Sequence, residues 1–386
     1  MAARPGCDRR RRRAWNELER RTAGRESTAT GVRIRTGVHD RSTTTTRPLT
    51  DTRYNDRRDH RDPRSRRPRD HHDHTITMST PLDLEGVFPA MCTPFDDDER
   101  IDFETLQEDA QRLEAAGVDG LVPVGSTGES ATLTHDEHVR VVEAVIEAVD
   151  DVPVIAGTGS NNTREALELS ERAADAGADG LLLISPYYNK PEQRGLVDHY
   201  RTIADAVDLP QIVYNVPSRT GRNIEPDTAV ELASHENIAG YKAASGDLGQ
   251  IGEVVERTRD EDFAVLSGDD ALTLPMLSVG ATGAISVAAN IEPERTCAMV
   301  GAALDGDYAR ARALHHELGP LFRELFVETN PIPVKEAMQI RGYGPARLRS
   351  PLTRLSEEYR EDLAAVLADL EESSTEVADA GTEGDR

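Results

Sequence analysis

The sequence predicts an α/β fold: a (β/α)8 barrel, or TIM barrel, with a C-terminal helical domain and a disordered basic N-terminal extension. From residue 86 onward, short apolar segments alternate with amphipathic helical segments, the pattern of parallel β/α units. Eight apolar segments fit into about 210 residues, as a closed eight-stranded barrel requires. Beyond residue 290 there are more helical segments than a barrel needs. These observations together favour the barrel over an open doubly wound sheet, which usually has fewer strands and an early Gly-rich phosphate loop.

The first 77 of the 386 residues differ in composition from the rest. They hold 21 Arg, no Lys and 11 acidic residues, and they show neither helical nor strand periodicity. No apolar segment follows the arginines, so the pattern does not fit a secretory signal, and a transit peptide would be poorer in acidic residues. We expect 1–77 to be disordered or not made, with translation starting at Met78. RNA binding by this basic segment remains the alternative.

Apolar and β-branched residues define the expected strands, and amphipathic spacing defines the expected helices. The strands are expected at residues 87–93, 120–124, 152–156, 180–185, 211–215, 238–243, 264–267 and 283–287. Helices are expected at 103–116, 135–148, 164–176, 196–206 and 226–234, and later at 292–304, 308–325, 335–341 and 356–371. The barrel would then span 78–305, the helical domain 306–371 and a loose acidic tail 372–386.

The charge of the remaining chain limits its partners. Residues 78–386 have a net charge of −35, which repels nucleic acids and anionic membranes. No apolar run approaches the roughly 18 residues of a membrane-spanning helix. Three cysteines without motif spacing exclude a disulfide framework and a Cys-rich zinc site, so we expect a cytoplasmic protein. Only three lysines accompany this acidity, which indicates adaptation to high salt or, alternatively, a genomic preference for Arg codons.

Lys242 is the strongest catalytic candidate. It lies in an apolar segment, 238–245, near the C-terminal end of the sixth expected strand, where barrel enzymes place their chemistry. Burial there lowers the pKa of an amine and makes it nucleophilic, as a Schiff-base lysine requires. The alternative is a lysine that extends its amine to solvent at a strand end.

Three loops at expected strand ends carry polar side chains. Residues 125–130 (GSTGES) form a turn whose amides and hydroxyls could cradle a carboxylate. Residues 186–191 (PYYNKP) contain two adjacent tyrosines, and 214–221 (YNVPSRTG) place Arg219 as a partner for a substrate carboxylate. A plain loop and a surface ion pair are the alternatives. Two histidines near residue 135 have no third ligand, so we expect no metal site.

The motifs GSTGES, SPYYNKP, YNVPSRTG, GYKAASG, LSGDD, GAISVAAN and FVETNPIPVKEAM occur in one order and spacing over residues 86–367. Together they resemble the dihydrodipicolinate synthase branch of the pyruvate-dependent class I aldolases. The resemblance implies a barrel with a C-terminal helical domain that condenses pyruvate with aspartate 4-semialdehyde on the diaminopimelate route to lysine. It implies no metal and no organic cofactor. It also implies a homo-oligomer, a tetramer built as a dimer of dimers.

The resemblance assigns roles to individual residues. Lys242 would form the imine with the pyruvate carbonyl. Tyr214 would shuttle protons through hydrogen bonds to Thr127 and to Tyr188, the latter reaching in from a neighbouring subunit. Arg219 would hold the semialdehyde carboxylate.

The remaining substrate contacts come from main chain and pocket walls. The backbone N–H groups of Ser126 and Thr127 would bind the pyruvate carboxylate, and Ile285 and Gly268 would line the pocket. Two positions depart from the family pattern. Ser126 stands where this branch usually has Thr, a form that sialic acid lyases share, and Ala243 stands where Glu is common, for which we have no explanation.

Lysine-inhibited members of the family bind lysine at the tight dimer interface. Seven positions match that site: Ser130, Ala131, His135, His138, Asn161, Glu165 and Tyr187. Glu165 would pair with the α-ammonium group of lysine. We therefore expect lysine to be a feedback inhibitor.

Two other functions remain open. A sibling aldolase acting on a 2-keto-3-deoxy sugar acid or on N-acetylneuraminate would keep Lys242 and Tyr214, but it would lack the PYYN pair together with Arg219. A non-catalytic barrel that binds a small ligand is the alternative from another class. The combination of Lys242, Tyr214 and Thr127 argues against it.

Overall fold

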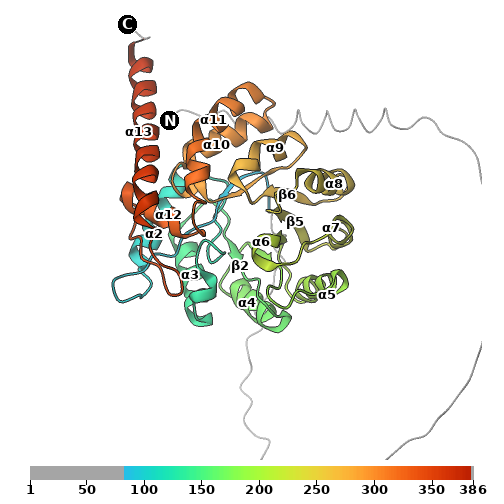
Figure 1. The fold of residues 1–386 in the computed structure, drawn as a ribbon. Helices are drawn as coiled ribbons and strands as arrows, with labels where there is room; N and C mark the ends of the chain where they lie inside the picture. Colours follow the sequence, from blue (N-terminus) through green and yellow to red (C-terminus); the bar gives the residue numbers. More distant parts are fainter. Residues whose placement is uncertain (1–81, 384–386) are drawn as a thin grey trace, which may run out of the picture. The chain divides into compact units, whose positions relative to one another are not determined.

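In the part of the chain that the computed structural model describes, residues 82–383, seven parallel strands form one curled sheet (Figure 1). Their order in the sheet is β1-β7-β6-β5-β4-β3-β2. The strands are β1 (Gly86–Pro89), β2 (Ile155–Gly157), β3 (Gly180–Ile184), β4 (Gln211–Asn215), β5 (Ile238–Ala243), β6 (Ala264–Ser267) and β7 (Gly283–Ser286). Seven of the eight expected strands are confirmed. The expectations for 1–77 and for a start at Met78 lie outside the described residues.

The eighth expected strand, 120–124, is not a regular strand, so that prediction is wrong in detail. The segment nevertheless joins the two ends of the sheet: Leu121 forms a parallel bridge to Val154, and Val122 forms one to Ala90. The ladder stops there because the next residue is a proline without an N–H, and the residue after it has a φ of +50°. The segment thus closes the barrel between β1 and β2, and the (β/α)8 architecture is confirmed.

Side chains alternate between the barrel interior and the helix layer, as the two-residue period of a strand requires. On β4, Val213 packs outward against the helices, whereas Ile212 and Tyr214 point into the barrel. The interior core consists mainly of apolar side chains from successive strands: Leu84, Phe88, Ala90, Val122, Ile155, Leu182, Ile212, Leu266 and Ile285. Tyr214 is the polar member of this core, at the C-terminal end of its strand.

An outer ring of helices covers the strands (Figure 1). Its members are α2 (Phe103–Ala115), α3 (His135–Ala148), α4 (Thr163–Asp175), α5 (Gln193–Ala204), α7 (Pro226–Ala233), α8 (Leu248–Thr258), α9 (Thr273–Ser278) and α10 (Pro293–Leu304). Short polar residues begin several of them. Thr134 and Glu137 form a capping box at the start of α3, in which each side chain satisfies a backbone N–H of the other residue.

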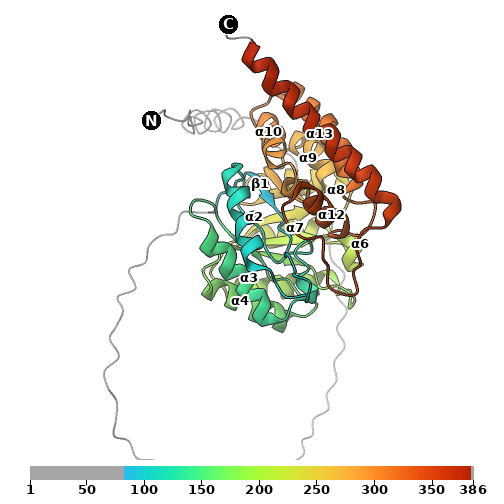
Figure 2. The same ribbon diagram turned by 90° about the vertical axis from the view of Figure 1, so that its left-hand side faces the viewer.

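Three further helices follow the barrel: α11 (Tyr308–Glu324), α12 (Ile332–Arg341) and α13 (Glu357–Glu383). They share an apolar core with α10, in which Met299 packs with Leu321, Leu363 and Leu367. Barrel and added helices therefore belong to one compact unit. Figure 2 shows α13 running past α12 and beyond the other helices.

The expected loose tail is helical as far as Glu383, so this expectation is wrong for residues 372–383. That segment contains no proline, the residue that most strongly ends a helix. Among the described residues, no helix is long and apolar enough to cross a membrane. The same residues contain no group of three or more His, Cys, Asp or Glu side chains that could hold a metal ion.

Candidate active site

A cavity of about 710 Å³ opens at the C-terminal ends of the strands, beneath the segment that leads into α12. It brings together residues from loops and strands far apart in the sequence. Six of the expected site residues line it: Ser126, Thr127, Tyr214, Arg219, Lys242 and Gly268. Part of the remaining wall comes from 326–330, just before α12.

Lys242 lies near the C-terminal end of β5, with only 6% of its surface exposed. It is the register partner of Tyr214 on β4, and its Nζ lies 4.3 Å from the centroid of the Tyr214 ring. Burial lowers the pKa of its amine to about 7; the positive charge of Arg219 adds to this shift, and the carboxylate of Asp270 opposes it. A substantial fraction of this amine is therefore uncharged near neutral pH, which a nucleophile requires.

Asp270 is a buried carboxylate that the sequence patterns did not single out. It accepts hydrogen bonds from Ser286 Oγ at 2.5 Å and from the backbone N–H groups of Val287 and Ala288 at 3.1 and 2.9 Å. These bonds hold the turn after β7, and the charge of Asp270 reaches Lys242. Its signal in the sequence is the motif LSGDD, which begins in the last two residues of β6.

Gly268 leaves the space that the Lys242 side chain occupies. A Cβ at this position would lie 2.8 Å from Lys242 Cε and 3.1 Å from its Cγ. Real Cβ atoms essentially never approach another heavy atom below 3.0 Å. A side chain at 268 would therefore displace the amine.

Three residues are expected to shuttle protons, and two of them, Tyr214 and Thr127, lie in this cavity. Tyr214 is buried, and burial raises the pKa of its phenol to about 12. Thr127 is also buried, and its hydroxyl accepts a hydrogen bond from Asn330 Nδ2 at 2.9 Å. Tyr188 does not line this cavity but the second one, described below: 86% of its surface is exposed, and its φ is +66°.

The turn that holds Ser126 and Thr127 has a strained backbone on both sides. Val124 has a φ of +50° and Glu129 a φ of +52°, values that non-glycine residues adopt at a cost of about 1–3 kcal/mol. Within residues 82–383, neither the Ser126 nor the Thr127 N–H donates to a protein acceptor. The turn therefore presents two amide donors at the cavity, suited to an anionic ligand.

Arg219 belongs to α6 (Pro217–Thr220), a single helical turn after β4. Its Nη2 donates to the backbone carbonyl of Asn330 at 2.7 Å, which fixes the guanidinium group at the cavity wall. Ile285, the remaining expected pocket residue, lies on β7 with 1% exposure and packs in the barrel interior. It does not line either of the two cavities described here.

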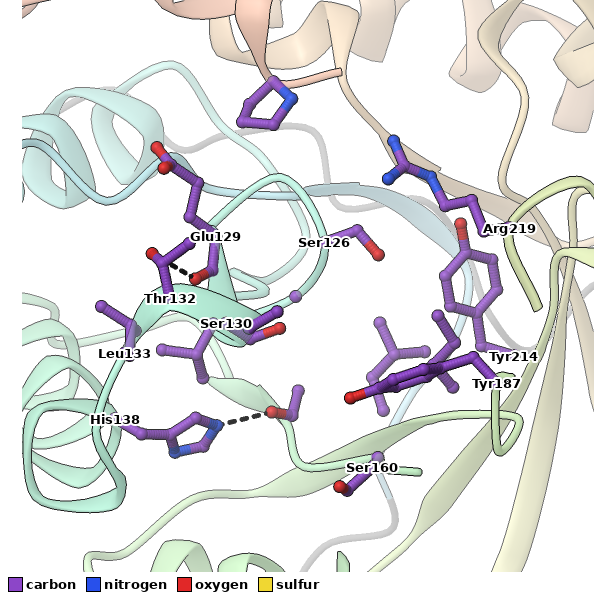
Figure 3. Close-up of a pocket in the computed structure, with 18 of the residues that line it drawn as sticks. Ser126, Glu129, Ser130, Thr132, Leu133, His138, Ser160, Tyr187, Tyr214 and Arg219 are labelled. Carbon is purple, nitrogen blue, oxygen red and sulfur yellow. Dashed lines mark hydrogen bonds between the residues drawn. The ribbon is translucent and has the colours of Figure 1, made fainter. Parts of the chain in front are cut away.

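A second cavity, of about 570 Å³, adjoins the first and shares Ser126, Tyr214 and Arg219 with it. Figure 3 shows Tyr214 and Arg219 along one side of it and η1 (Ser130–Thr132) with His138 along the other. Six of the seven positions expected to bind lysine line this cavity: Ser130, Ala131, His135, His138, Glu165 and Tyr187. The seventh, Asn161, is not among its lining residues; its Oδ1 accepts from Asn189 Nδ2 at 3.2 Å.

Hydrogen bonds keep Glu165 ionised in this second cavity. Its carboxylate accepts from Ser160 Oγ and lies 2.9 Å from His135 Nε2. The bond from Ser160, followed by that from His135, holds the pKa of the carboxyl below its usual value. His138 differs: burial lowers its pKa to about 4, and its Nε2 lies 2.8 Å from the Gly157 carbonyl, so the neutral ring donates there. Among the residues expected to bind lysine, Glu165 therefore supplies a negative charge beside the neutral His138; the cavity is also lined by the Arg219 guanidinium and by Glu129, which is paired with Lys335.

A buried ion pair joins the 125–130 turn to α12. Lys335 Nζ donates to the Glu129 carboxylate, and it also donates to the Arg347 carbonyl at 2.8 Å. The side chains of Lys335 and Glu129 are 1% and 0% exposed. The second oxygen of Glu129 accepts from the Arg349 N–H. Neither residue of the pair was assigned a role from the sequence, although both stand within the motifs that carry the family resemblance.

Comparison with known proteins agrees with this geometry. The family model for the Dihydrodipicolinate synthetase family matches residues 83–370. A 4-hydroxy-tetrahydrodipicolinate synthase from Haloarcula marismortui is 79% identical over 297 residues, covering 77% of this chain and 97% of that protein. The chloride-inhibited dihydrodipicolinate synthase from Acinetobacter baumannii, solved with pyruvate, is similar at 42% identity and a TM-score of 0.73, over 75% of this chain and 99% of that one.

A further solved structure of a similar protein contains lysine. The enzyme from Cyanidioschyzon merolae, with lysine bound, is 39% identical with a TM-score of 0.72, over 74% of this chain and 98% of that one. A family match over most of the described residues, together with relatives of such identity covered almost end to end, shows the family. The chain belongs to the dihydrodipicolinate synthetase family.

Proposed function

We propose that this chain is a lyase that condenses pyruvate with L-aspartate 4-semialdehyde to give 4-hydroxy-tetrahydrodipicolinate, in lysine biosynthesis through diaminopimelate. One observation carries the proposal. Lys242 is buried in a cavity at the C-terminal ends of the strands, with its pKa lowered to about 7 and the Tyr214 phenol beside it. The family membership given above supports the same activity.

The first half-reaction uses Lys242 as a nucleophile. Its uncharged amine adds to the C2 carbonyl of pyruvate, and the resulting hydroxyl leaves as water after it takes a proton from Tyr214. The amides of Ser126 and Thr127 hold the pyruvate carboxylate. The cationic imine withdraws electrons from C3, and the Tyr214 phenolate then takes the C3 proton, which leaves a nucleophilic enamine and restores the phenol.

The second half-reaction joins the two substrates. Arg219 holds the carboxylate of the semialdehyde by charge-assisted hydrogen bonds, so its aldehyde carbon faces C3 of the enamine. A carbon–carbon bond forms between them, the imine becomes cationic again, and the aldehyde oxygen takes the Tyr214 phenol proton to become a hydroxyl; the Tyr214 phenolate regains a proton from the ring nitrogen in the final step. The amino group of the second substrate then attacks the imine carbon, displaces Lys242 and closes the ring.

Lysine is proposed as the feedback inhibitor, bound in the second cavity. The ionised Glu165 carboxylate suits the α-ammonium group, and Tyr187 and the backbone of η1 offer polar partners. This cavity shares Ser126, Tyr214 and Arg219 with the first, so a lysine molecule bound in it would lie beside residues of the catalytic cavity. The lysine-bound relative from Cyanidioschyzon merolae supports this assignment.

The proposal includes a homotetramer built as a dimer of dimers. The Tyr188 side chain, beyond the end of β3, supports an oligomer, because it is largely exposed, does not line the catalytic cavity of its own chain and is therefore accessible to a neighbouring subunit. We also propose that the enzyme is cytoplasmic and adapted to high salt. The net charge of −35 beyond residue 77 and the presence of only three lysines support the adaptation to salt.

The direct test is pyruvate consumption by the purified protein in multimolar KCl, with aspartate 4-semialdehyde and glyceraldehyde offered separately. We expect turnover with the semialdehyde and little with glyceraldehyde, because only the former has the carboxylate that Arg219 binds. Turnover with glyceraldehyde alone would make the protein a sugar-acid aldolase.

A further inference from the structure

Asn330 forms hydrogen bonds with two residues of the catalytic cavity, Thr127 and Arg219, which are both far from it in the sequence. Its side-chain Nδ2 donates to Thr127 Oγ1 at 2.9 Å, across 203 residues of sequence. Its backbone carbonyl accepts from Arg219 Nη2 at 2.7 Å. Asn330 is 6% exposed and lines both cavities. None of the roles derived above includes it.

The direction of the Thr127 hydrogen bond determines what its hydroxyl can do. A threonine hydroxyl has one proton to donate and two lone pairs that accept. Because Asn330 is the donor, the bond occupies a lone pair and leaves the proton free. Among the described residues, no protein acceptor takes that proton from Thr127. The proton is therefore available to the cavity, where the Tyr214 phenol also lies.

The proposed mechanism places a negative charge on Tyr214 after the phenol protonates the leaving hydroxyl. Burial disfavours the charged phenolate and so raises the pKa of the Tyr214 phenol. A hydroxyl that donates to the phenolate offsets the cost, and a donor behind the hydroxyl polarises it further. A hydroxyl that donated to Asn330 instead could not do so.

We propose that Asn330 is a positioning residue for the condensation: its amide donates to Thr127 and so directs the Thr127 hydroxyl proton towards Tyr214. The inference rests on the proposed function, since it concerns the proton steps of that reaction. Asn330 acts through Thr127 and makes no bond to the reacting atoms. Its carbonyl holds Arg219 separately, and a side-chain substitution leaves that bond intact.

Exchange of the pyruvate C3 hydrogens with D2O, followed by NMR in KCl, measures the proton step without the second substrate. Asn330→Asp keeps the shape but removes the donor, so Thr127 must donate to the new carboxylate. We expect exchange and kcat to fall about tenfold or more, since positioned proton transfer is worth 10²–10⁴-fold. The KM for the semialdehyde should change less than threefold, because Arg219 keeps its carbonyl partner. Asn330→Ala, which also removes the donor, should slow exchange as well.

A double-mutant cycle separates positioning from a structural role. If Asn330 acts through Thr127, Asn330→Ala should slow exchange in the native background but add little in Thr127→Val. Borohydride should still trap pyruvate on Lys242 in each variant, and the melting temperatures identify any variant that has lost its fold. Native-like exchange in Asn330→Asp, or additive effects in the cycle, would overturn the inference. A wild-type protein that neither traps nor exchanges pyruvate would instead contradict the proposed function itself, and this inference with it.

Discussion

Lys242 and Tyr214 are register partners on adjacent parallel strands, with the Lys242 amine 4.3 Å from the centroid of the Tyr214 ring. In a parallel sheet, register partners point to the same face, so the two side chains enter the barrel together. Both stand one residue before the end of their strand. The strand pairing alone thus places a nucleophile beside a proton donor at the barrel mouth.

The rate of imine formation should follow the uncharged fraction of the Lys242 amine. With a pKa of about 7, kcat/KM for pyruvate should rise with pH below that value and level off above it. Stopped-flow measurement of pyruvate binding between pH 5.5 and 9 checks this. A rise that has not levelled off by pH 9, as expected for an amine with the ordinary lysine pKa, would show that burial does not depress the pKa of this amine.

The same shift predicts how stability depends on pH. The amine has a pKa of about 7 when folded and its ordinary value of 10.5 when unfolded, so between these values the unfolded chain binds more protons. This group therefore makes the free energy of unfolding rise with pH from about 7 to 10.5. Denaturant titrations of the native protein and Lys242→Met across that window should differ in slope. Parallel pH dependences would contradict the assignment.

Gly268→Ala should impair catalysis by displacing the amine. The added Cβ would stand 2.8 Å from Lys242 Cε, and a displacement near 1 Å can cost about 10²-fold in rate. The matched control is Gly252→Ala in α8, where a Cβ meets nothing within 4 Å and alanine is the better helix former. Steady-state kinetics should separate the two variants. Equal kcat/KM for pyruvate in both would refute the steric argument.

Lys335→Met should destabilise the protein by about 3–5 kcal/mol, because it leaves the Glu129 carboxylate buried and without its cation. Glu129→Gln combined with Lys335→Met should recover much of that loss. Asp97→Asn, which breaks an exposed pair with Arg347, serves as the control and should leave the denaturation midpoint unchanged. Chemical denaturation at fixed KCl measures all three. A native midpoint in Lys335→Met would mean that the pair contributes nothing.

Glu165→Gln should weaken inhibition by lysine about tenfold or more, the usual contribution of a charge-assisted hydrogen bond. The control is Glu168→Gln. Glu168 lies on α4 like Glu165, its carboxylate is 4.0 Å from His135 Nδ1, and its side chain is more exposed than that of Glu165. The ratio of rates with and without lysine gives the effect in each variant. Unchanged inhibition in Glu165→Gln would remove this carboxylate from the lysine site.

Much of the fold follows from local pattern, because eight apolar segments at regular spacing leave few arrangements besides a barrel. The bounds of β4, β5, β6 and α3 were predicted to the residue. The segment at 120–124 was not, since its hydrogen bonding depends on a positive φ at Val124, which a β-branched residue does not suggest. The tail differs for another reason: its acidic composition suits a loop and a helix equally.

The site was predicted where residue type and strand position coincide, as for Lys242, Tyr214 and Arg219. Asn330, Asp270 and the Lys335–Glu129 pair were missed as functional elements, because their partners lie up to 206 residues away and only the folded chain brings them together. Ile285 stays a prediction: the family pattern places it at the pocket, and in the structure it packs in the same barrel-core cluster as Tyr214 without lining either cavity.

Borohydride reduction in the presence of pyruvate tests the central claim most directly, because it converts the imine into a stable carboxyethyl group on the reacting lysine. Peptide mass spectrometry of the treated protein in KCl should find this group on Lys242, and a Lys242→Arg variant should remain unmodified and inactive. A modification on Lys190 or Lys335 instead, or turnover without any modification of Lys242, would contradict the account.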